Sequence, residues 1–141
     1  MSEASSPFDG ELPATAVGAK TLAFERDELA AVRELVAGEA ARASLPGERS
    51  IALTVAVNEL AANCVLHGGG AGTVQVWLEP DAVVAEVSDG GWIKDPLAGR
   101  LRPGPSQEHG RGLWMVNQLC DLVQIRSGVS GTRVRVRVGL E

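Results

Sequence analysis

The chain has 141 residues, of which 45% are hydrophobic and 22% are charged, and its formal net charge is -5. This length is typical of one domain, and the apolar fraction is large enough for a core. The negative charge argues against a nucleic-acid interface, which needs a basic face. No apolar run approaches a membrane span in length and no secretion signal is visible, so we expect a cytoplasmic protein without a membrane partner.

The first half of the chain predicts a tail, a short strand and two helices. Residues 1–19 are rich in Ser, Ala, Pro and Gly, which is typical of a disordered tail or linker, so the domain is placed over 20–141. A first strand is expected over 20–25. A helix follows over about 28–43, with Asp27 as its N-cap and one apolar face made of Leu29, Val32, Leu35 and Val36.

A second helix is expected to begin at Pro46 and to continue to about residue 66, where the glycine-rich run 68–72 ends it. Beyond it, strands over 73–78 and 83–87 form a hairpin, and the second strand ends at Asp89. Residues 93–108 contain three prolines and two glycines, which is typical of a long loop acting as a lid. A helix over 112–119 and a hairpin joining 121–126 to 132–138 complete the predicted elements.

The last strand alternates Val and Arg strictly from Val134 to Val138. This period predicts that the valines face the core and that the arginines, Arg133, Arg135 and Arg137, face water. A solvated edge strand is the favoured interpretation, and a basic face for an acidic partner is the alternative. The two cysteines, Cys64 and Cys120, lie in apolar stretches without metal-ligand spacing, so we expect both to be buried.

Three polar residues, Glu59, Asn63 and His67, are spaced four apart in the apolar second helix, so they lie in one row. Buried polar groups need partners, which leaves two interpretations: a polar network that fixes helix packing, or a nucleotide–metal site. Asn63 offers the single oxygen ligand that suits Mg²⁺ bound largely through phosphates and water. Glu59 is placed to accept a proton from an attacking hydroxyl, and His67 is either a ligand-side residue or a helix cap.

Two later segments fit a nucleotide. The segment Asp89-Gly90-Gly91 lies at a strand end and has two interpretations. It is either an ordinary turn, or it supplies the Asp89 carboxylate to accept a hydrogen bond from the adenine amino group. In the second case Gly91 lets the ring approach the backbone. The segment Gly110-Arg111-Gly112-Leu113 lies between the lid and a helix. Glycines before a helix leave backbone N–H groups available to phosphate, and Arg111 adds positive charge.

Five features follow one another along the chain and together form one pattern. They are Glu-x-x-x-Asn on a helix, Asp-x-Gly after a strand, a lid, Gly-x-Gly before a helix, and a closing Gly131-Thr132. This pattern resembles the N, G1 and G2 boxes of the histidine-kinase-like ATPase superfamily, also called the GHKL or Bergerat fold. Spacing and length look most like its anti-sigma factor serine kinase branch, over roughly residues 20–138. The resemblance implies an α/β (α+β) two-layer sandwich with a mixed, mostly antiparallel sheet and helices on one face.

The resemblance also implies a role for each matching residue. Glu59 matches the general base, and Asn63 matches the Mg²⁺ ligand. Asp89 matches the aspartate that reads adenine. The other nucleotide-side positions are expected at His67, Gly91, Gly110, Arg111, Gly112, Leu113 and Thr132. In the fuller G1 pattern a second glycine stands where this chain has Ile93, so a stiffer lid hinge or a reshaped pocket is expected there.

The resemblance implies an ATP- and Mg²⁺-dependent serine/threonine kinase. Such a kinase is expected to phosphorylate a STAS-type anti-anti-sigma partner and to sequester a sigma factor, and family members of this type are often dimers. One alternative is a nucleotide-binding module that captures partners without phosphotransfer, which Ile93 favours and Glu59 opposes. Another is the ATPase end of a larger sensor. A conventional histidine kinase is disfavoured because both histidines, His67 and His109, lie inside nucleotide-site motifs.

Overall fold

The computed structural model describes residues 18–90, 108–128 and 131–141 of the chain. This part contains five strands, three α-helices and one short 3₁₀ helix. The elements, in chain order, are β1 (Lys20–Glu25), η2 (Arg26–Glu28), α1 (Leu29–Arg42), α2 (Gly47–His67), β2 (Ala71–Glu79), β3 (Ala82–Asp89), α3 (Glu108–Leu119), β4 (Leu122–Gly128) and β5 (Gly131–Gly139).

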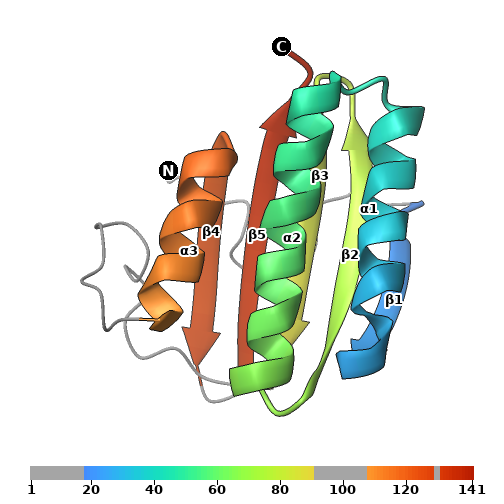
Figure 1. Ribbon diagram of the computed structural model, residues 1–141. Coiled ribbons are helices and arrows are strands. Elements are labelled where there is room, and N and C mark those ends of the chain that lie inside the picture. Colours follow the sequence, from blue (N-terminus) through green and yellow to red (C-terminus); the bar gives the residue numbers. More distant parts are fainter. Residues whose placement is uncertain (1–17, 91–107, 129–130) are drawn as a thin grey trace, which may run out of the picture.

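The strands form one sheet in the order β1-β2-β3-β5-β4, and all three α-helices cover the same face of it (Figure 1). The predicted two-layer α+β sandwich is therefore confirmed. The sheet was expected to be mixed, but every pairing among the described strands is antiparallel. The pairing of β3 with β5 brings Asp89 opposite Thr132, which lies far along the chain.

The core lies between the sheet and the helices because both layers present apolar residues there. Val134, Val136 and Val138 of β5 are almost fully buried on the helix side, as their alternation predicted. α2 runs across the middle of the sheet and contributes the largest helical share of the core. Its buried residues are Leu53, Ala56, Val57, Leu60, Ala61 and Cys64.

α1 begins differently from the sequence-based expectation. Asp27 does not cap it, because a 3₁₀ turn over Arg26–Glu28 comes first and α1 starts at Leu29. The backbone N–H of Glu25 donates to Glu28 Oε1 at 2.8 Å, so two glutamates stabilise this turn. The expected apolar face is confirmed, since Val32 and Val36 are fully buried and the two leucines, Leu29 and Leu35, pack against the core.

α3 begins at Glu108, four residues earlier than predicted. Gly110 and Gly112 therefore lie inside its first turns and do not precede it. Glycine disfavours helix interiors by about 1 kcal/mol relative to alanine, which is why the sequence pointed to a later start. Packing of α3 against α2 overrides this local preference. The predicted lid, residues 93–108, lies outside the described residues except for Glu108.

The arginines of β5 do not simply face water. β5 lies between β3 and β4 and is not an edge strand, which corrects the favoured interpretation. Arg135 is only 5% exposed, and Glu86 on the neighbouring strand is 3% exposed. Arg135 donates to Glu86 Oε1 from Nε at 2.9 Å and from Nη2 at 2.8 Å, and its guanidinium lies 5.3 Å from the ring centre of Trp77. A buried ion pair, in which two guanidinium nitrogens donate to one carboxylate oxygen, thus occupies the sheet face opposite the helices.

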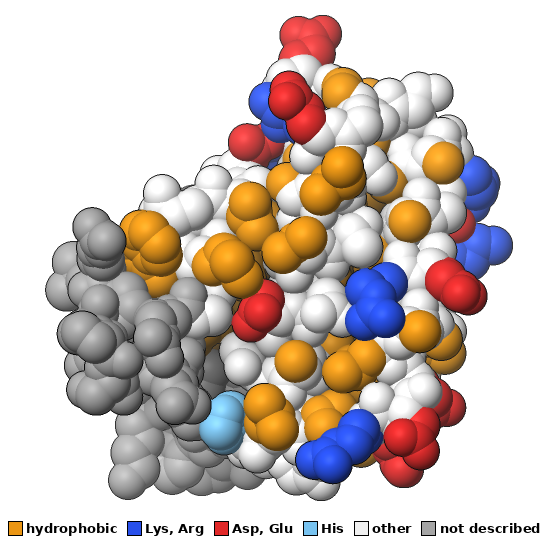
Figure 2. Space-filling view, in the orientation of Figure 1, with side chains coloured by type: hydrophobic (Ala, Val, Ile, Leu, Met, Phe, Trp, Pro, Cys, Tyr) orange, Lys and Arg blue, Asp and Glu red, His pale blue; other side chains and the backbone are white. Residues whose placement is uncertain are grey.

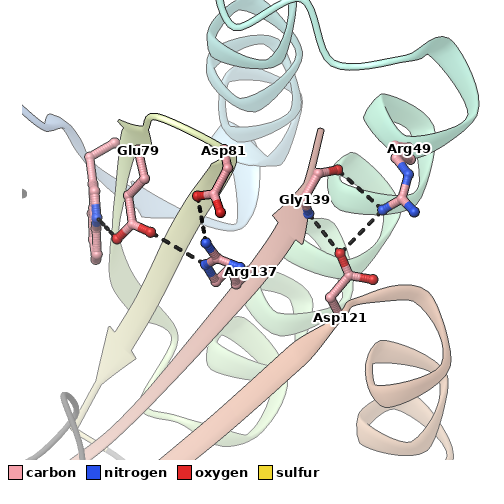
Figure 3. Close-up of polar contacts among 7 residues, drawn as sticks. Arg49, Glu79, Asp81, Asp121, Arg137 and Gly139 are labelled. Atoms are coloured by element: carbon pink, nitrogen blue, oxygen red, sulfur yellow. Dashed lines mark hydrogen bonds and ion pairs between the residues drawn. The ribbon is translucent and has the colours of Figure 1, made fainter. Parts of the chain in front are cut away.

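Two further arginines join elements at one end of the sheet (Figure 3). Arg49, near the start of α2, donates to Asp121 Oδ2 at 3.2 Å and to the carbonyl oxygen of Gly139 at 3.1 Å. Asp121 Oδ2 also accepts the backbone N–H of Gly139 at 2.7 Å. On the neighbouring strands, Arg137 contacts Glu79 and Asp81. The start of α2 and the end of β5 are thereby held together through Asp121.

α2 is long and apolar enough to cross a membrane by length and composition, which corrects the expectation that no segment approaches this length. In the structure it packs on the sheet. Its outer side carries exposed apolar residues, and Figure 2 shows apolar side chains gathered along this helix-covered face. The exposed members on α2 are Ile51, Val55 and Leu66.

Candidate functional site

The row of polar residues on α2 meets α3 at a glycine. Glu59 and Asn63 are half-buried. A Cβ added at Gly112 of α3 would lie 3.1 Å from Glu59 Oε2 and 3.4 Å from Asn63 Nδ2. The absence of a side chain at Gly112 therefore lets α3 approach both polar residues closely. The structure brings together three of the predicted site residues from two helices.

A second group gathers around a small cavity of about 40 Å³. Asn63 from α2, Asp89 from the end of β3 and Thr132 from the start of β5 all line it. The remaining wall is apolar and is made of Leu60, Cys64, Val87, Leu113 and Val134. Because Asn63 belongs to this wall and also lies next to Gly112, the two groups form one continuous site between α2, α3 and the sheet.

The strand ends that hold Asp89 and Thr132 are fixed by cross-strand contacts. The two residues are Cα partners in the β3–β5 ladder. Thr132 is 5% exposed, and its hydroxyl lies 2.7 Å from the hydroxyl of Ser127 on β4. At Gly131, φ is +121°, and an added Cβ would collide with the carbonyl oxygen of Asp89. A glycine is required there by both the backbone angle and the close approach.

Two residues at the end of α2, one inside the helix and one just past it, lie against the Asp89 carboxylate. The Cys64 thiol hydrogen-bonds with Asp89, and both burial and this carboxylate raise the pKa of the thiol well above its usual range. Gly68, just past the end of α2, packs so closely that an added Cβ would collide with the carboxylate. Sequence reasoning expected Cys64 only as a buried apolar residue. Its position one residue after Asn63 was the signal that it also lines the site.

A larger hollow of about 460 Å³ adjoins the same strand ends. It shares Asp89 and Thr132 with the small cavity and adds Arg126 and Arg133, which are cross-strand partners on β4 and β5. The expected basic face of the last strand thus contributes one residue, Arg133, beside the site. Arg126 was missed, because only the pairing register of β4 with β5 places it there.

The remaining predicted site residues have different outcomes. His67 is exposed at the last position of α2 and is not among the described residues that line the cavity. Leu113 lines it and is 4% exposed. Gly110 lies in the first turn of α3. Gly91 and the side chain of Arg111 fall outside the described part of the chain, as do Trp92 and Ile93.

The oxygen-bearing side chains of the site fit a cation that takes only one ligand from the protein. Among the described residues, no group of three or more His, Cys, Asp or Glu side chains could form a protein-only metal site. Asn63 offers one amide oxygen at the site, which suits Mg²⁺ completed by phosphate oxygens and water. Glu59 lies one turn away as a carboxylate. Asp89 offers an acceptor at the opposite end, next to an apolar wall that suits a flat base.

Comparison with known proteins agrees with this fold. Residues 22–138 match the model of a family described as histidine kinase-like ATPase domain. The fold is similar to the crystal structure of the RsbU and RsbW domains of Rv1364c from Mycobacterium tuberculosis, with a TM-score of 0.62 and 20% sequence identity. That match covers 84% of this chain and 32% of the solved chain, so this chain spans about a third of its length. Comparison with curated proteins gives no match.

Proposed function

Because the chain belongs to the histidine kinase-like ATPase domain family, we propose that it binds Mg²⁺–ATP and transfers the γ-phosphoryl group to a serine or threonine of a partner protein. The partner proposed is an anti-anti-sigma protein of the STAS type. A sigma factor is the second partner, held by direct binding in a cytoplasmic regulator of transcription that works as a dimer. The observation that carries the proposal is the single site formed by Glu59, Asn63, Asp89 and Thr132.

Each end of the site has its own chemical role. Asp89 accepts a hydrogen bond from the adenine amino group, and the apolar wall with Leu113 and Val134 packs against the ring. Asn63 holds the cation through its amide oxygen. The cation, when bound, neutralises charge on the phosphates as the phosphoryl group moves.

Glu59 completes the transfer as general base. Its carboxylate takes the proton from the attacking hydroxyl of the partner while that oxygen bonds to the γ-phosphorus and the bond to the β-phosphate oxygen breaks. The position of the Glu59 carboxylate one helical turn from Asn63, the proposed cation ligand, supports this role. Pure nucleotide binding gives no reason for a carboxylate at this position.

Nucleotide binding is tested by calorimetry with Mg²⁺–ATP. Asn63→Ala and Asp89→Asn are each expected to weaken binding by about tenfold or more, equal to about 1.4 kcal/mol. Asn58→Ala is the matched control. It removes an amide from the same helix at a position where Asn58 Oδ1 accepts a hydrogen bond from Arg33 at 2.8 Å, outside the site. No binding to the wild type at millimolar ATP would overturn the proposal.

Phosphotransfer is tested separately with labelled ATP and a STAS-type protein. Glu59→Gln is expected to abolish transfer to serine while ATP affinity stays within a few-fold of wild type, because the amide cannot accept the proton. If the wild type binds ATP but transfers nothing, the alternative function is a nucleotide-dependent module that captures partners. In that case the kinase proposal fails and the binding proposal stands.

A further inference from the structure

The outer side of α2 carries a row of apolar residues at the surface. Among the described residues four large hydrophobic side chains are exposed, and three of them, Ile51, Val55 and Leu66, lie on this helix. Their spacings of four and eleven residues bring them to one helix face, and Ala62 lies between them on the same face. These four residues are termed the apolar row, which belongs to the apolar surface along α2 in Figure 2. Single exposed apolar residues are ordinary, whereas several on one helix face indicate an interaction surface.

The proposed general base, Glu59, lies on one border of the apolar row. It comes four residues after Val55 and three before Ala62, so its Cβ atom is about 5–6 Å from theirs. On its other side Glu59 meets α3, where a Cβ added at Gly112 would lie 3.1 Å from Glu59 Oε2. The apolar row therefore begins where the proposed site of phosphoryl transfer ends.

The opposite border of the row carries an anchored positive charge. Asn58 lies on the α1 side of α2, where its Oδ1 accepts a hydrogen bond from Arg33 Nη1 at 2.8 Å. α1 and α3 lie on opposite sides of α2 (Figure 1), so Arg33 and Glu59 flank the apolar row. Arg33 is exposed and forms no ion pair within the described part of the chain. A guanidinium has five N–H donors, so Arg33 can also bind a carboxylate of a partner that lies along the row.

We propose that the apolar row is the surface on which the phosphoryl-accepting protein docks. An apolar segment of that protein lies along the row, with the acceptor hydroxyl on its Glu59 side and a carboxylate on its Arg33 side. This inference rests on the proposed phosphotransfer and adds the place and the chemistry of the partner contact.

The position of Glu59 favours the acceptor protein over other occupants. A hydroxyl that gives its proton to Glu59 comes within hydrogen-bond distance of the carboxylate, about 2.6–3.2 Å. Val55 and Ala62 are the neighbours of Glu59 on the outer face, so a protein whose hydroxyl reaches Glu59 also covers them. The row extends about 22 Å from Ile51 to Leu66, the length of about four turns of a partner helix. A second copy of this chain on the row would instead cover Glu59 and exclude the acceptor.

The test is steady-state phosphotransfer from Mg²⁺–ATP to the STAS-type protein, with kcat and the KM for that protein measured separately. Ile51→Gln and Leu66→Gln place a helix-compatible polar side chain at exposed positions, so the fold is kept. Each is expected to raise the KM for the acceptor about fivefold while kcat and ATP affinity stay unchanged. The two positions are about 22 Å apart, so the double variant is expected to raise this KM about 25-fold. Leu122→Gln is the matched control, because it removes the fourth exposed large hydrophobic residue, which lies on β4.

The charged border is tested through the salt dependence of the same KM. Arg33→Gln is expected to raise the KM for the acceptor about threefold at low ionic strength and to have little effect at about 0.5 M salt, because salt screens an exposed ion pair. Arg42→Gln is the control, since this exposed arginine of α1 is paired with Glu39. An equal increase at both salt concentrations would show that Arg33 does not meet a carboxylate, which contradicts the proposed partner chemistry.

The outcomes separate the docking surface from the proposed function. If the wild type transfers the phosphoryl group and the double Gln variant keeps the wild-type KM, the docking surface is wrong while the kinase proposal stands. If the wild type sediments as a dimer and the double variant as a monomer with an unchanged KM, the row binds a second copy, which also overturns the inference. If the wild type binds ATP but transfers nothing, the kinase proposal fails and this inference fails with it.

Discussion

Gly112 of α3 lies against Glu59 of α2, so closely that an added Cβ would stand 3.1 Å from Glu59 Oε2. The same Cβ would be 3.4 Å from Asn63 Nδ2. A glycine thus sets the separation of two helices at the point where the proposed base and the proposed cation ligand meet. The helix that carries it is the one that follows the predicted lid in the chain.

Gly112→Ala is therefore expected to weaken Mg²⁺–ATP binding by about threefold, because the methyl group pushes the Glu59 carboxylate aside by a few tenths of an ångström, whereas its distance from Asn63 is ordinary contact. Alanine favours a helix by about 1 kcal/mol over glycine, so any loss arises from the contact and not from the helix itself. Calorimetry and urea unfolding measure the two effects. Gly38→Ala in α1 should raise stability by about 0.5–1 kcal/mol and leave ATP affinity unchanged. Wild-type affinity in Gly112→Ala would contradict the close approach.

The buried pair of Glu86 and Arg135 gives a prediction for stability. Arg135→Met leaves a carboxylate buried without its main partner, and we expect a loss of about 3 kcal/mol in the free energy of unfolding. Glu86→Leu is expected to cost a similar amount. The double variant should cost much less than the sum, because it leaves no buried charge. Urea unfolding of all four proteins measures this coupling, and additive losses would show that the pair is not coupled.

The contacts of Asp121 predict that removing this acceptor costs more stability than removing its arginine donor. Asp121→Ala removes the acceptor for the Gly139 N–H and for Arg49, and we expect a loss of about 1–2 kcal/mol in stability. Arg49→Ala should cost less than about 1 kcal/mol, because this ion pair is partly exposed to solvent. Arg42→Ala is the control, since its pair with Glu39 is local to α1. An equal loss from Arg49→Ala and Asp121→Ala would contradict this ranking.

Cys120 predicts a decline of stability at high pH. Burial and the negative charge of Asp121 raise the pKa of its thiol from 9.0 to about 12. In the unfolded chain the thiol loses its proton near pH 9, whereas the folded protein keeps it, so stability is complete below pH 9 and falls as pH rises towards 12. The slope is at most about 1.4 kcal/mol per pH unit for one group. Urea midpoints at pH 8, 9 and 10 should decline less steeply in Cys120→Ala.

Cys64 contributes to this decline in the same direction, because its thiol pKa is also raised. The Cys120→Ala variant is therefore expected to keep part of the decline of stability with pH. A double variant, Cys64→Ala with Cys120→Ala, is expected to lose the rest of that decline. Identical slopes in the wild type and both variants would show that neither thiol stays protonated in the folded state.

Local sequence patterns predicted most of the fold, because hydrophobic residues recur with the period of a helix or of a strand. The alternation of β5 placed its valines correctly in the core, and the spacing of Val32 and Val36 identified the buried face of α1. The same alternation misplaced Arg135. Whether an outward-facing arginine meets water depends on its neighbours, and only the strand order puts Glu86 and Trp77 beside it. Strand order depends on residues that are far apart in the sequence, so the two-residue alternation along one strand does not reveal it.

The candidate site was likewise predicted only in part from the sequence. The resemblance to a known family singled out Glu59, Asn63, Asp89 and Thr132, and the structure brings them to one site. The contacts that Cys64 and Gly68 make with Asp89 were not foreseen, because each residue has an ordinary local explanation as a buried thiol or a helix stop. These contacts follow only from the packing of the end of α2 onto the end of β3.

The pairing of Asp89 with Thr132 closes a long loop that holds residues 90–131. The entropy cost of closing a loop grows slowly with its length, by about 0.6 kcal/mol for each doubling. The proposed base-reading end of the site is therefore anchored by two neighbouring strands whatever the length of the segment between them. The span also contains α3 and β4, so a change in its length is expected to be tolerated only where α3 still packs on α2 and β4 still pairs with β5.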